Sequence, residues 1–252
     1  MRGGAAAVPE PMRKKISLKT RRPELTQAAF RDHYETRHVP LGLSFVDRFQ
    51  WRRYVRNYVV DTIGEPVGFD AYTEFWIDDD ADEEALARFI ASPEFRPLDE
   101  DDRRFLDVGA RFSCDVTETP LWHQPPGDAS RQPSPIPRVK ATLLLRSATG
   151  AITDGHALAR RLAAPLGDAV VEARIDRALD PVAGAPFDTL LTFLLEDARP
   201  AALDLDALPT ALPWSLLTVD PVETPRDLLF EPDATTRAEG HAARAPTRRN
   251  PT

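Results

Sequence analysis

The histidines in the segment FRDHYETRHVPLG, residues 30–42, are the first side chains that could do chemistry. The chain has five histidines, and His33 and His38 are two of them. On a helix, Phe30, Tyr34 and His38 recur every four residues, so they share one inward-facing stripe. A half-buried imidazole loses hydration, which lowers its pKa and keeps it neutral. A neutral His38 beside a substrate would be a general base, worth about 10²–10⁴-fold when well placed.

His38 has a second interpretation, in which it is a core histidine bonded to a backbone carbonyl. Pro40 is predicted to end the helix two residues later, because proline lacks an N–H and its ring clashes with the preceding turn. A helix C-terminus favours the imidazolium, which opposes the effect of burial. His33 and Arg37 flank the stripe at i and i+4. Arg37 could hold an anionic oxygen such as a carboxylate or enolate, although such a pair is more often a solvated helix face.

Tyrosines occupy two predicted strands. The strand at residues 51–61 carries Tyr54 and Tyr58, which lie four residues apart and therefore share one face. The strand at residues 69–77 carries Tyr72. If these faces line a pocket, Tyr54 or Tyr72 could donate a hydrogen bond to a developing oxyanion. Ordinary sheet packing is the alternative.

The strand at residues 69–77 also carries Glu74 and Trp76, on the same face as Tyr72. Trp76 could stack on an aromatic substrate. Glu74 on an inner face would be a second titratable group with a raised pKa. It could equally pair with Arg53 or Arg56 across the sheet.

Other patterns exclude several kinds of site. The acidic run DDDADEE, residues 78–84, opens a predicted helix and lacks the spaced ligands and the glycine of a calcium loop. Cys114 is the only cysteine, which excludes an internal disulfide and a cysteine-based zinc or iron–sulfur site. The sequence has no glycine-rich phosphate loop, serine elbow or HExxH motif. It therefore predicts no cofactor and no metal site.

The charge and hydropathy of the chain limit its partners. A formal net charge of −8 over 252 residues argues against nucleic acid and against an anionic membrane surface. No apolar run approaches the roughly 18–20 residues that span a bilayer. Residues 1–11 lack the apolar core of a secretory signal and are predicted to be a disordered extension. We therefore expect a cytoplasmic protein that binds small molecules.

The predicted elements of residues 12–121 follow the order β-α-β-β-α-β. A strand at residues 14–20 precedes a helix capped by Thr26, and the two tyrosine-bearing strands come next. Helices are predicted at residues 82–91 and 99–106, and a strand at 110–118 closes the unit. This order is that of a ferredoxin-like domain.

The same order repeats after a linker. Residues 122–137 are dense in proline and predict the linker, residues 138–223 predict the second domain, and residues 224–252 predict a disordered tail. Within the second domain we expect strands at 139–145, 170–175, 190–195 and 214–222, a helix at 154–165 and a weak helix at 203–212. An open sheet with helices on one face needs cover on the other. The sequence therefore predicts an α+β fold in which two such sheets pack face to face.

The two copies share the tripeptide PLG, at residues 40–42 and 165–167. Aligning these tripeptides puts Ala163 opposite His38. A helix end can therefore be built at this point without a histidine, so the fold does not require His38.

The motifs FRDHYETRHVPL, YVRNY, EFW, ASPEF and DDRRFLD occur in this order and resemble those of the EthD family. The resemblance covers about residues 12–119. The second half fits as a diverged copy, so the resemblance implies a fused tandem pseudo-dimer with two ferredoxin-like repeats, an intrachain dimeric α/β barrel. It also implies a small, mostly apolar pocket between helices and sheet in each half. Family members include proteins needed for ether degradation and cofactor-free enzymes of aromatic polyketide pathways.

Carried over residue by residue, the family's histidine falls on His38, and its Glu-x-Trp strand falls on Glu74 and Trp76. The family's Asn-His pair at the end of the second strand is Asn57-Tyr58 in this sequence. This departure argues against the family's two-histidine mechanism.

These observations predict a cofactor-independent lyase or isomerase/cyclase that uses proton transfer on a small aromatic or polyketide-like substrate, as a dehydratase, decarboxylase or cyclase does. The predicted catalytic residues are His38, Tyr54 and Glu74, and the predicted substrate contacts are Tyr34, Arg37, Tyr58, Tyr72 and Trp76. Two alternatives remain open: a non-catalytic ligand- or haem-binding accessory protein of a degradative pathway, and a cofactor-free oxygenase. The fused halves predict a monomeric pseudo-dimer or a homodimer of it.

Overall fold

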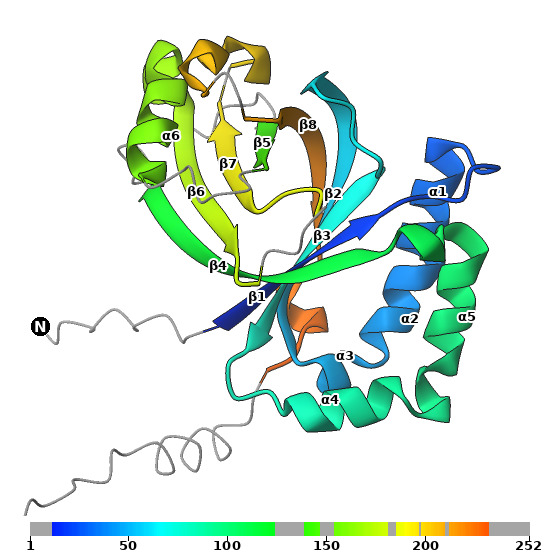
Figure 1. Cartoon of the computed structure of the whole chain (residues 1–252). Helices are drawn as coiled ribbons and strands as arrows, with labels where there is room; N and C mark the ends of the chain where they lie inside the picture. The colour runs from blue at the N-terminus through cyan, green and yellow to red at the C-terminus, as the bar shows by residue number, and fades with distance from the viewer. Residues whose placement is uncertain are drawn as a thin grey trace, which may run out of the picture.

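The computed structural model describes residues 12–123, 139–146, 154–180, 185–196, 198–209 and 212–231. The strands in these ranges are β1 (Met12–Lys19), β2 (Trp51–Gly64), β3 (Ala71–Asp78), β4 (Phe112–His123), β5 (Val139–Leu145), β6 (Val170–Ala178), β7 (Thr189–Leu195) and β8 (Trp214–Glu223). They close into one antiparallel barrel in the order β1-β3-β2-β8-β5-β7-β6-β4 (Figure 1). The fold is therefore α+β, with the helices outside the barrel.

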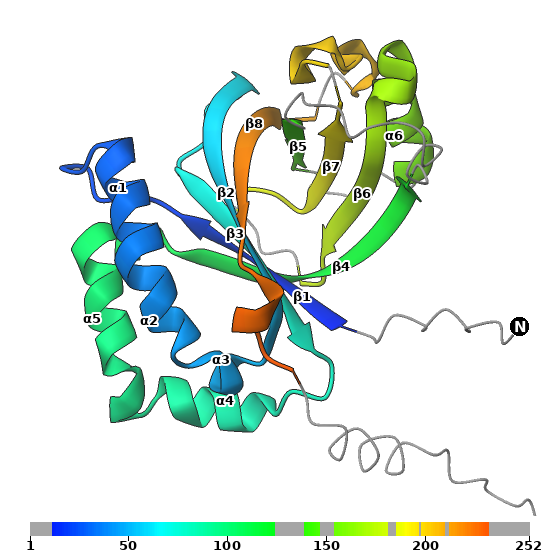
Figure 2. The same cartoon turned by 180° about the vertical axis from the view of Figure 1, so that it is seen from behind.

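The helices cover the barrel at two places (Figure 1, Figure 2). Those of the first half lie together on one side: α1 (Gln27–His33), α2 (Val39–Leu43), α3 (Val46–Phe49), α4 (Glu83–Ile90) and α5 (Arg96–Phe105). The helix α6 (Gly155–Ala163) lies beside β6 in the second half. Among the helices of the described residues, none combines the length and the apolarity that a membrane crossing needs.

The barrel closes through two pairs of strands, each with one strand from β1–β4 and one from β5–β8. β2 pairs with β8, and β4 pairs with β6, both antiparallel. The two sheets that the sequence predicts to face each other are thus also joined by backbone hydrogen bonds at both edges. Closure leaves neither sheet with an open edge at these strands, so a second chain has no edge to extend there.

Both faces of the first-half sheet are buried, because one faces the barrel interior and the other faces the helices. In β1, Ile16 and Leu18 belong to the apolar cluster inside the barrel. Lys15, Ser17 and Lys19 alternate with them and lie on the helix side. The sheet thus separates two environments, and every candidate residue on it belongs to one or the other.

The helix that carries His38 does not end at Pro40, contrary to the prediction. A π turn at Tyr34–His38, in which the N–H of Val39 bonds the carbonyl of Tyr34, joins α1 to α2, and α2 continues to Leu43. In a regular α-helix the proline ring would clash with the carbonyl four residues earlier. The wider turn just before Pro40 relieves that clash.

The weak helix predicted at residues 203–212 is wrong. The described part of this segment forms short 3₁₀ turns at Pro200–Ala202 and Leu205–Ala207. Pro209 restricts the residue before it to extended conformations, which prevents a continuous helix. By contrast, Asp82 and Asp154, at the predicted starts of the helices at residues 82–91 and 154–165, cap α4 and α6.

Two domain boundaries need correction. β4 continues to His123, past the predicted start of the linker at residue 122. Residues 224–231, predicted to begin the disordered tail, pack on the first half: Leu229 is buried in its core and the N–H of Phe230 bonds the carbonyl of Trp51 at 2.9 Å. The remaining disorder and linker predictions, for residues 1–11, 124–137 and 232–252, fall outside the described residues.

Candidate active site

A cavity of about 270 Å³ lies between the first-half sheet and its helices. Aromatic rings stack along its wall: Phe49 on Trp51 with centroids 4.4 Å apart, and Tyr54 on Phe75 at 4.8 Å. Such flat apolar walls suit a planar ligand. The polar side chains that line the cavity are Lys15, Ser17, Lys19, Tyr34, His38, Tyr54, Asp102 and Ser113.

His38 lines this cavity and shares a carboxylate with His33. Nδ1 of His38 lies 3.1 Å from Oδ2 of Asp101, and Nε2 of His33 lies 3.0 Å from Oδ1 of the same residue. Asp101 is 4% exposed. Because a carboxylate only accepts, each imidazole must donate to it. This assigns the proton of neutral His38 to Nδ1 and leaves the lone pair on Nε2.

The π turn makes this shared contact possible. His33 and His38 are five residues apart, and on an α-helix such positions point about 140° apart around the axis. The widened turn between them brings both rings to α5. There both rings pack on Phe105, with centroid separations of 4.7 and 5.0 Å. Departures of this kind are frequent at functional sites.

Burial lowers the pKa of His38, and the carboxylates of Asp102 and Asp101 oppose that effect only in part. The imidazole is therefore neutral at neutral pH, as the sequence predicts. Nε2 lies 3.6 Å from Oδ1 of Asp102, too far for a hydrogen bond. The other oxygen of Asp102 accepts from Arg111 at 2.9 Å. Nε2 of His38 therefore remains free to accept a proton from a ligand.

Lys19 brings a cation to the cavity from the end of β1. It is half-buried, and burial lowers its pKa while the charge of Asp102 opposes the shift. Within the described part of the chain, no ion pair at 4.0 Å or less involves its ammonium group. Lys19 can therefore meet an anionic oxygen of a ligand.

Two buried tyrosines add hydroxyl groups. Tyr54 donates to the hydroxyl of Tyr34 at 3.3 Å, and both side chains line the cavity. Burial raises the pKa of both phenols. They stay protonated at neutral pH and can donate hydrogen bonds, but they cannot act as bases.

Tyr58 does not line the cavity, although it shares a face with Tyr54 as predicted. Its hydroxyl donates to Glu35 at 2.6 Å, and Arg56 binds the same carboxylate at 2.9 and 3.0 Å. Glu35 lies in the π turn. Tyr58 and Arg56 therefore fix this turn to β2, which makes Tyr58 a supporting residue rather than a substrate contact.

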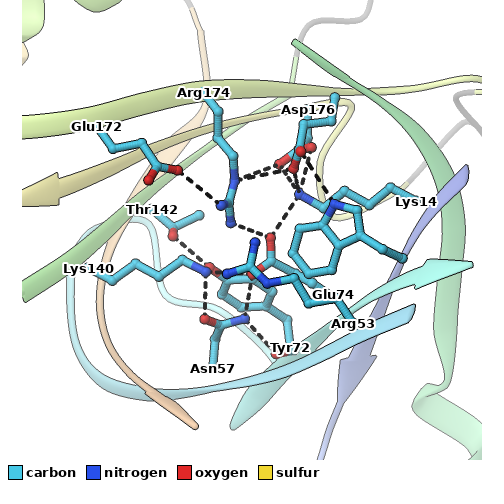
Figure 3. A network of polar contacts seen from close by, with 12 residues as sticks. Lys14, Arg53, Asn57, Tyr72, Glu74, Lys140, Thr142, Glu172, Arg174 and Asp176 are labelled. Atoms are coloured by element: carbon cyan, nitrogen blue, oxygen red, sulfur yellow. Dashed lines mark hydrogen bonds and ion pairs between the residues drawn. The ribbon is translucent and has the colours of Figure 1, made fainter. Parts of the chain in front are cut away.

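Glu74, Tyr72 and Trp76 share a face, but that face lies inside the barrel, across the sheet from His38. Figure 3 shows Glu74 at the centre of a polar network. It binds Lys14 at 2.9 Å, Lys140 at 2.5 Å and Arg174 at 2.6 Å, and it accepts from Asn57 at 3.0 Å. Tyr72 bonds Thr142 at 2.6 Å, and Lys14 and Arg53 each lie 4.5 Å from the ring centre of Trp76.

The prediction of a raised pKa for Glu74 is wrong. Burial favours the neutral acid, but Arg174, Lys14 and Lys140 together hold the pKa of Glu74 well below its ordinary value. Glu74 pairs with these three cations rather than with Arg53 or Arg56. Glu74 therefore stays ionised and links β3 to β1, β5 and β6. A carboxylate with so low a pKa is unsuited to act as a general acid or base.

Arg37, the predicted anion contact, is exposed and does not line the cavity. In the second half, a separate hollow lined by Trp122, Arg160 and Ala163 lies beside the end of α6. Ala163 is the residue that the PLG alignment puts opposite His38. The described lining of that hollow has no histidine, aspartate or glutamate.

Asp101, Asp102 and Lys19 are the site residues that the sequence analysis missed. The two aspartates lie in the charged run DDRRFLD, which looks like a solvated helix face. One signal was available: a helix over these residues turns Asp101 and Phe105, four residues apart, toward the same side. For Lys19, the only indication in the sequence is that strand alternation puts it on the face opposite Ile16 and Leu18. Among the described residues, no group of three His, Cys, Asp or Glu side chains is arranged to hold a metal ion.

Residues 22–109 match the family model of the EthD domain. This part of the chain is similar to the EthD domain. The match contains the whole π turn, the two histidines that contact Asp101, and both Asp101 and Asp102. The matched segment thus supplies His38, Asp101 and Asp102, whereas Lys19 precedes it and β5 to β8 complete the barrel. A search of curated proteins gave no significant match.

Several solved structures resemble the chain. An ethyl tert-butyl ether (EthD) family protein from Bacillus halodurans is 23% identical, with 43% of this chain and 100% of that chain covered and a TM-score of 0.32. A candidate monooxygenase from Lactobacillus acidophilus is 10% identical, with coverages of 86% and 97% and a TM-score of 0.45. A chlorite dismutase from Candidatus Nitrospira defluvii is 13% identical, with coverages of 87% and 94% and a TM-score of 0.40. Similarities this distant carry no inference about what this chain acts on.

Proposed function

We propose that the protein is a cofactor-independent enzyme that removes a proton from carbon next to a carbonyl group of a small aromatic or polyketide-like substrate. One observation carries the proposal: in an aromatic-walled cavity, Asp101 holds Nδ1 of a neutral His38, so that Nε2 is free to accept a proton. A positioned base with a lowered pKa in a cavity is the usual form of such a site.

The reaction follows from the groups around the cavity. His38 Nε2 takes the proton as the carbon–hydrogen bond breaks, and the electron pair moves onto the carbonyl oxygen to give an enolate. Asp101 stabilises the resulting imidazolium through Nδ1–H. Lys19 and the hydroxyl of Tyr34, whose own hydrogen is not used in the bond from Tyr54, are the donors available to the enolate oxygen. No step uses Glu74, Tyr72, Trp76 or Arg37.

Dehydration, decarboxylation, cyclisation and isomerisation can all proceed through an enolate. A product assay by mass spectrometry distinguishes them. The wild type and His38→Ala would be incubated without added cofactor, with and without oxygen, against a panel of phenolic ketones and polyketones. We expect a product whose formation requires His38 and does not require oxygen, with a mass lower by water or carbon dioxide, or unchanged for an isomer. Conversion that depends on oxygen would favour an oxygenase. Equal binding to both proteins without conversion, or visible absorbance of a bound haem, would favour the accessory protein.

We also infer that the chain is a fused pseudo-dimer of two ferredoxin-like units. The strand order supports this: β4-β1-β3-β2 in the first half corresponds to β8-β5-β7-β6 in the second. The second unit has lost its second helix and the counterpart of His38. A single active cavity per chain follows, with the second half acting as the partner that closes the barrel.

A further inference from the structure

Oxygen Oδ1 of Asp102 is buried and has no hydrogen-bond donor among the described residues. The contrast with its surroundings is sharp. Oδ2 of the same side chain accepts from Arg111 at 2.9 Å, and both oxygens of the neighbouring Asp101 accept from imidazoles. Buried carboxylate oxygens without a donor are rare in folded proteins, because the lost hydration is not replaced.

The surroundings of this oxygen show where a donor would come from. Asp102 lines the cavity together with His38, and Nε2 of His38 lies 3.6 Å from Oδ1. At that distance the imidazole itself makes no hydrogen bond to Asp102, even when protonated. A ligand atom that lies beside both groups, rather than between them, can reach each of them. The cavity therefore presents a base and a vacant acceptor side by side.

From this geometry we infer that the cavity binds a hydroxylated aromatic carbonyl compound, whose hydroxyl group donates a hydrogen bond to Oδ1 of Asp102 next to His38. Asp102 then determines specificity: it selects a ligand with a hydroxyl group at the edge that faces α5. The carbonyl part of this ligand rests on the proposed function, whereas the hydroxyl part rests on Asp102 alone.

The chemistry of the acceptor defines what it rejects. A methyl ether has the same oxygen but no hydrogen to donate, and its methyl group would face a buried negative charge. A hydrogen bond to a charged group that is lost in this way weakens binding by about 10- to 100-fold. Sites built to bond a hydroxyl discriminate against its analogues for this reason.

Binding of matched ligands to the full-length protein tests the inference. The probes are hydroxylated 1-tetralones, with the hydroxyl moved around the aromatic ring, and the corresponding methyl ethers. Trp51 lines the cavity, so tryptophan fluorescence should change when a ligand binds. Calorimetry measures the same affinities independently. We expect at least one hydroxytetralone to bind the wild type about 10- to 100-fold more tightly than its ether. In Asp102→Ala that preference should shrink to less than about threefold, and in Asp102→Asn, whose amide oxygen still accepts, it should fall to about tenfold or less.

Asp107→Asn is the matched control, because Asp107 lies on the same segment but only caps a 3₁₀ turn; it should keep the full preference. Circular dichroism and thermal melting would verify that all variants fold. Equal affinity of the wild type for hydroxyl and ether, no binding of either, or a preference that survives Asp102→Ala would overturn the inference.

Deuterium exchange into unsubstituted 1-tetralone separates this inference from the proposed function. Exchange by the wild type without any hydroxyl preference would leave the proton-transfer function standing and remove the role of Asp102. A hydroxyl preference that depends on Asp102, without exchange, would support the binding site and overturn the proposed catalysis.

Discussion

Nδ1 of His38 lies 3.1 Å from Oδ2 of Asp101, and this contact determines which nitrogen of the ring can act as a base. Asp101 is buried, and its other oxygen accepts from His33. The carboxylate therefore has a fixed position and fixes the tautomer of His38. The same arrangement orients the histidine of hydrolase triads on unrelated folds.

Asp101→Asn should lower the rate of proton transfer by about 10²–10⁴-fold, the usual worth of a well-placed base. The asparagine amide can donate to Nδ1, which would move the proton of His38 to Nε2 and block it. His33→Gln is the matched control: it removes the partner of the other carboxylate oxygen and should cost less than about tenfold. Steady-state kinetics measures both. An Asp101→Asn variant as active as the wild type would contradict the role of this contact.

The lowered pKa of His38 predicts the pH dependence of activity. Only the neutral imidazole accepts a proton, so the rate should fall at acid pH along a limb whose midpoint lies below 6.5, the ordinary value for histidine. A pH–rate profile of kcat/KM measures this limb. A limb centred above pH 6.5 would show that the imidazole is not desolvated as the structure indicates.

The same shift predicts a change in stability with pH. Because the pKa is lower in the folded state, the unfolded chain binds the proton first as the pH falls below 6.5. The contribution of His38 to the free energy of unfolding should therefore decrease as the pH falls through this window, and His38→Gln should remove that contribution. Urea unfolding at a series of pH values measures the difference, and parallel curves for the two proteins would contradict it.

Lys19→Met should lower kcat by about 10²–10³-fold, the cost of removing one donor to a developing oxyanion. Arg37→Met is the control, because Arg37 is exposed and lies outside the cavity lining. It should leave kcat and KM unchanged. The opposite pattern, a large loss with Arg37→Met and none with Lys19→Met, would return the anion contact to the residue that the sequence indicates.

Glu74→Gln should destabilise the protein by about 3–5 kcal/mol, because it leaves three buried cations without their shared carboxylate. Urea unfolding measures the change. Glu84→Gln, which breaks an exposed pair with Arg88, should cost no more than about 0.5 kcal/mol. If Glu74→Gln were as stable as wild type but inactive, Glu74 would regain the catalytic role that the structure assigns elsewhere.

The fused barrel predicts that its halves need each other. Separately expressed residues 1–124 and 125–252 should form a one-to-one complex, since β2 pairs with β8, β4 pairs with β6, and the Glu74 network joins both halves. Size exclusion with light scattering measures the stoichiometry. Halves that form homodimers and do not associate with each other would contradict the pseudo-dimer.

Local patterns in the sequence correctly predict the eight strands of the described residues to within a few residues at each end. Alternation placed Tyr54 with Tyr58, and Tyr72 with Glu74, on common faces. Alternation does not predict which face packs against the helices, because both faces of the sheet are buried and both carry apolar residues. The predicted site therefore mixed residues of the cavity with residues of the barrel interior.

The missed parts of the site depend on contacts between distant segments. Asp101 and Asp102 become buried only because α5 packs against the π turn, which is 60 or more residues away in the chain. The turn itself has one local cause, Pro40, but the same proline also predicts a helix end. Lys140 interrupts the apolar strand β5, and Arg174 lies on β6 among other charged residues, so neither signals a pair with Glu74 until the facing strand is known.

Hydrogen–deuterium exchange at the carbon next to the carbonyl of 1-tetralone tests the central claim most directly. The compound has no leaving group, so exchange in D₂O, followed by NMR, reports proton abstraction alone and does not depend on the later reaction. We predict that the wild type exchanges these hydrogens without added cofactor, and that His38→Gln, folded to the same extent, is at least about 10²-fold slower. Exchange at equal rates by both proteins, or by neither, would contradict the account of His38 as the base.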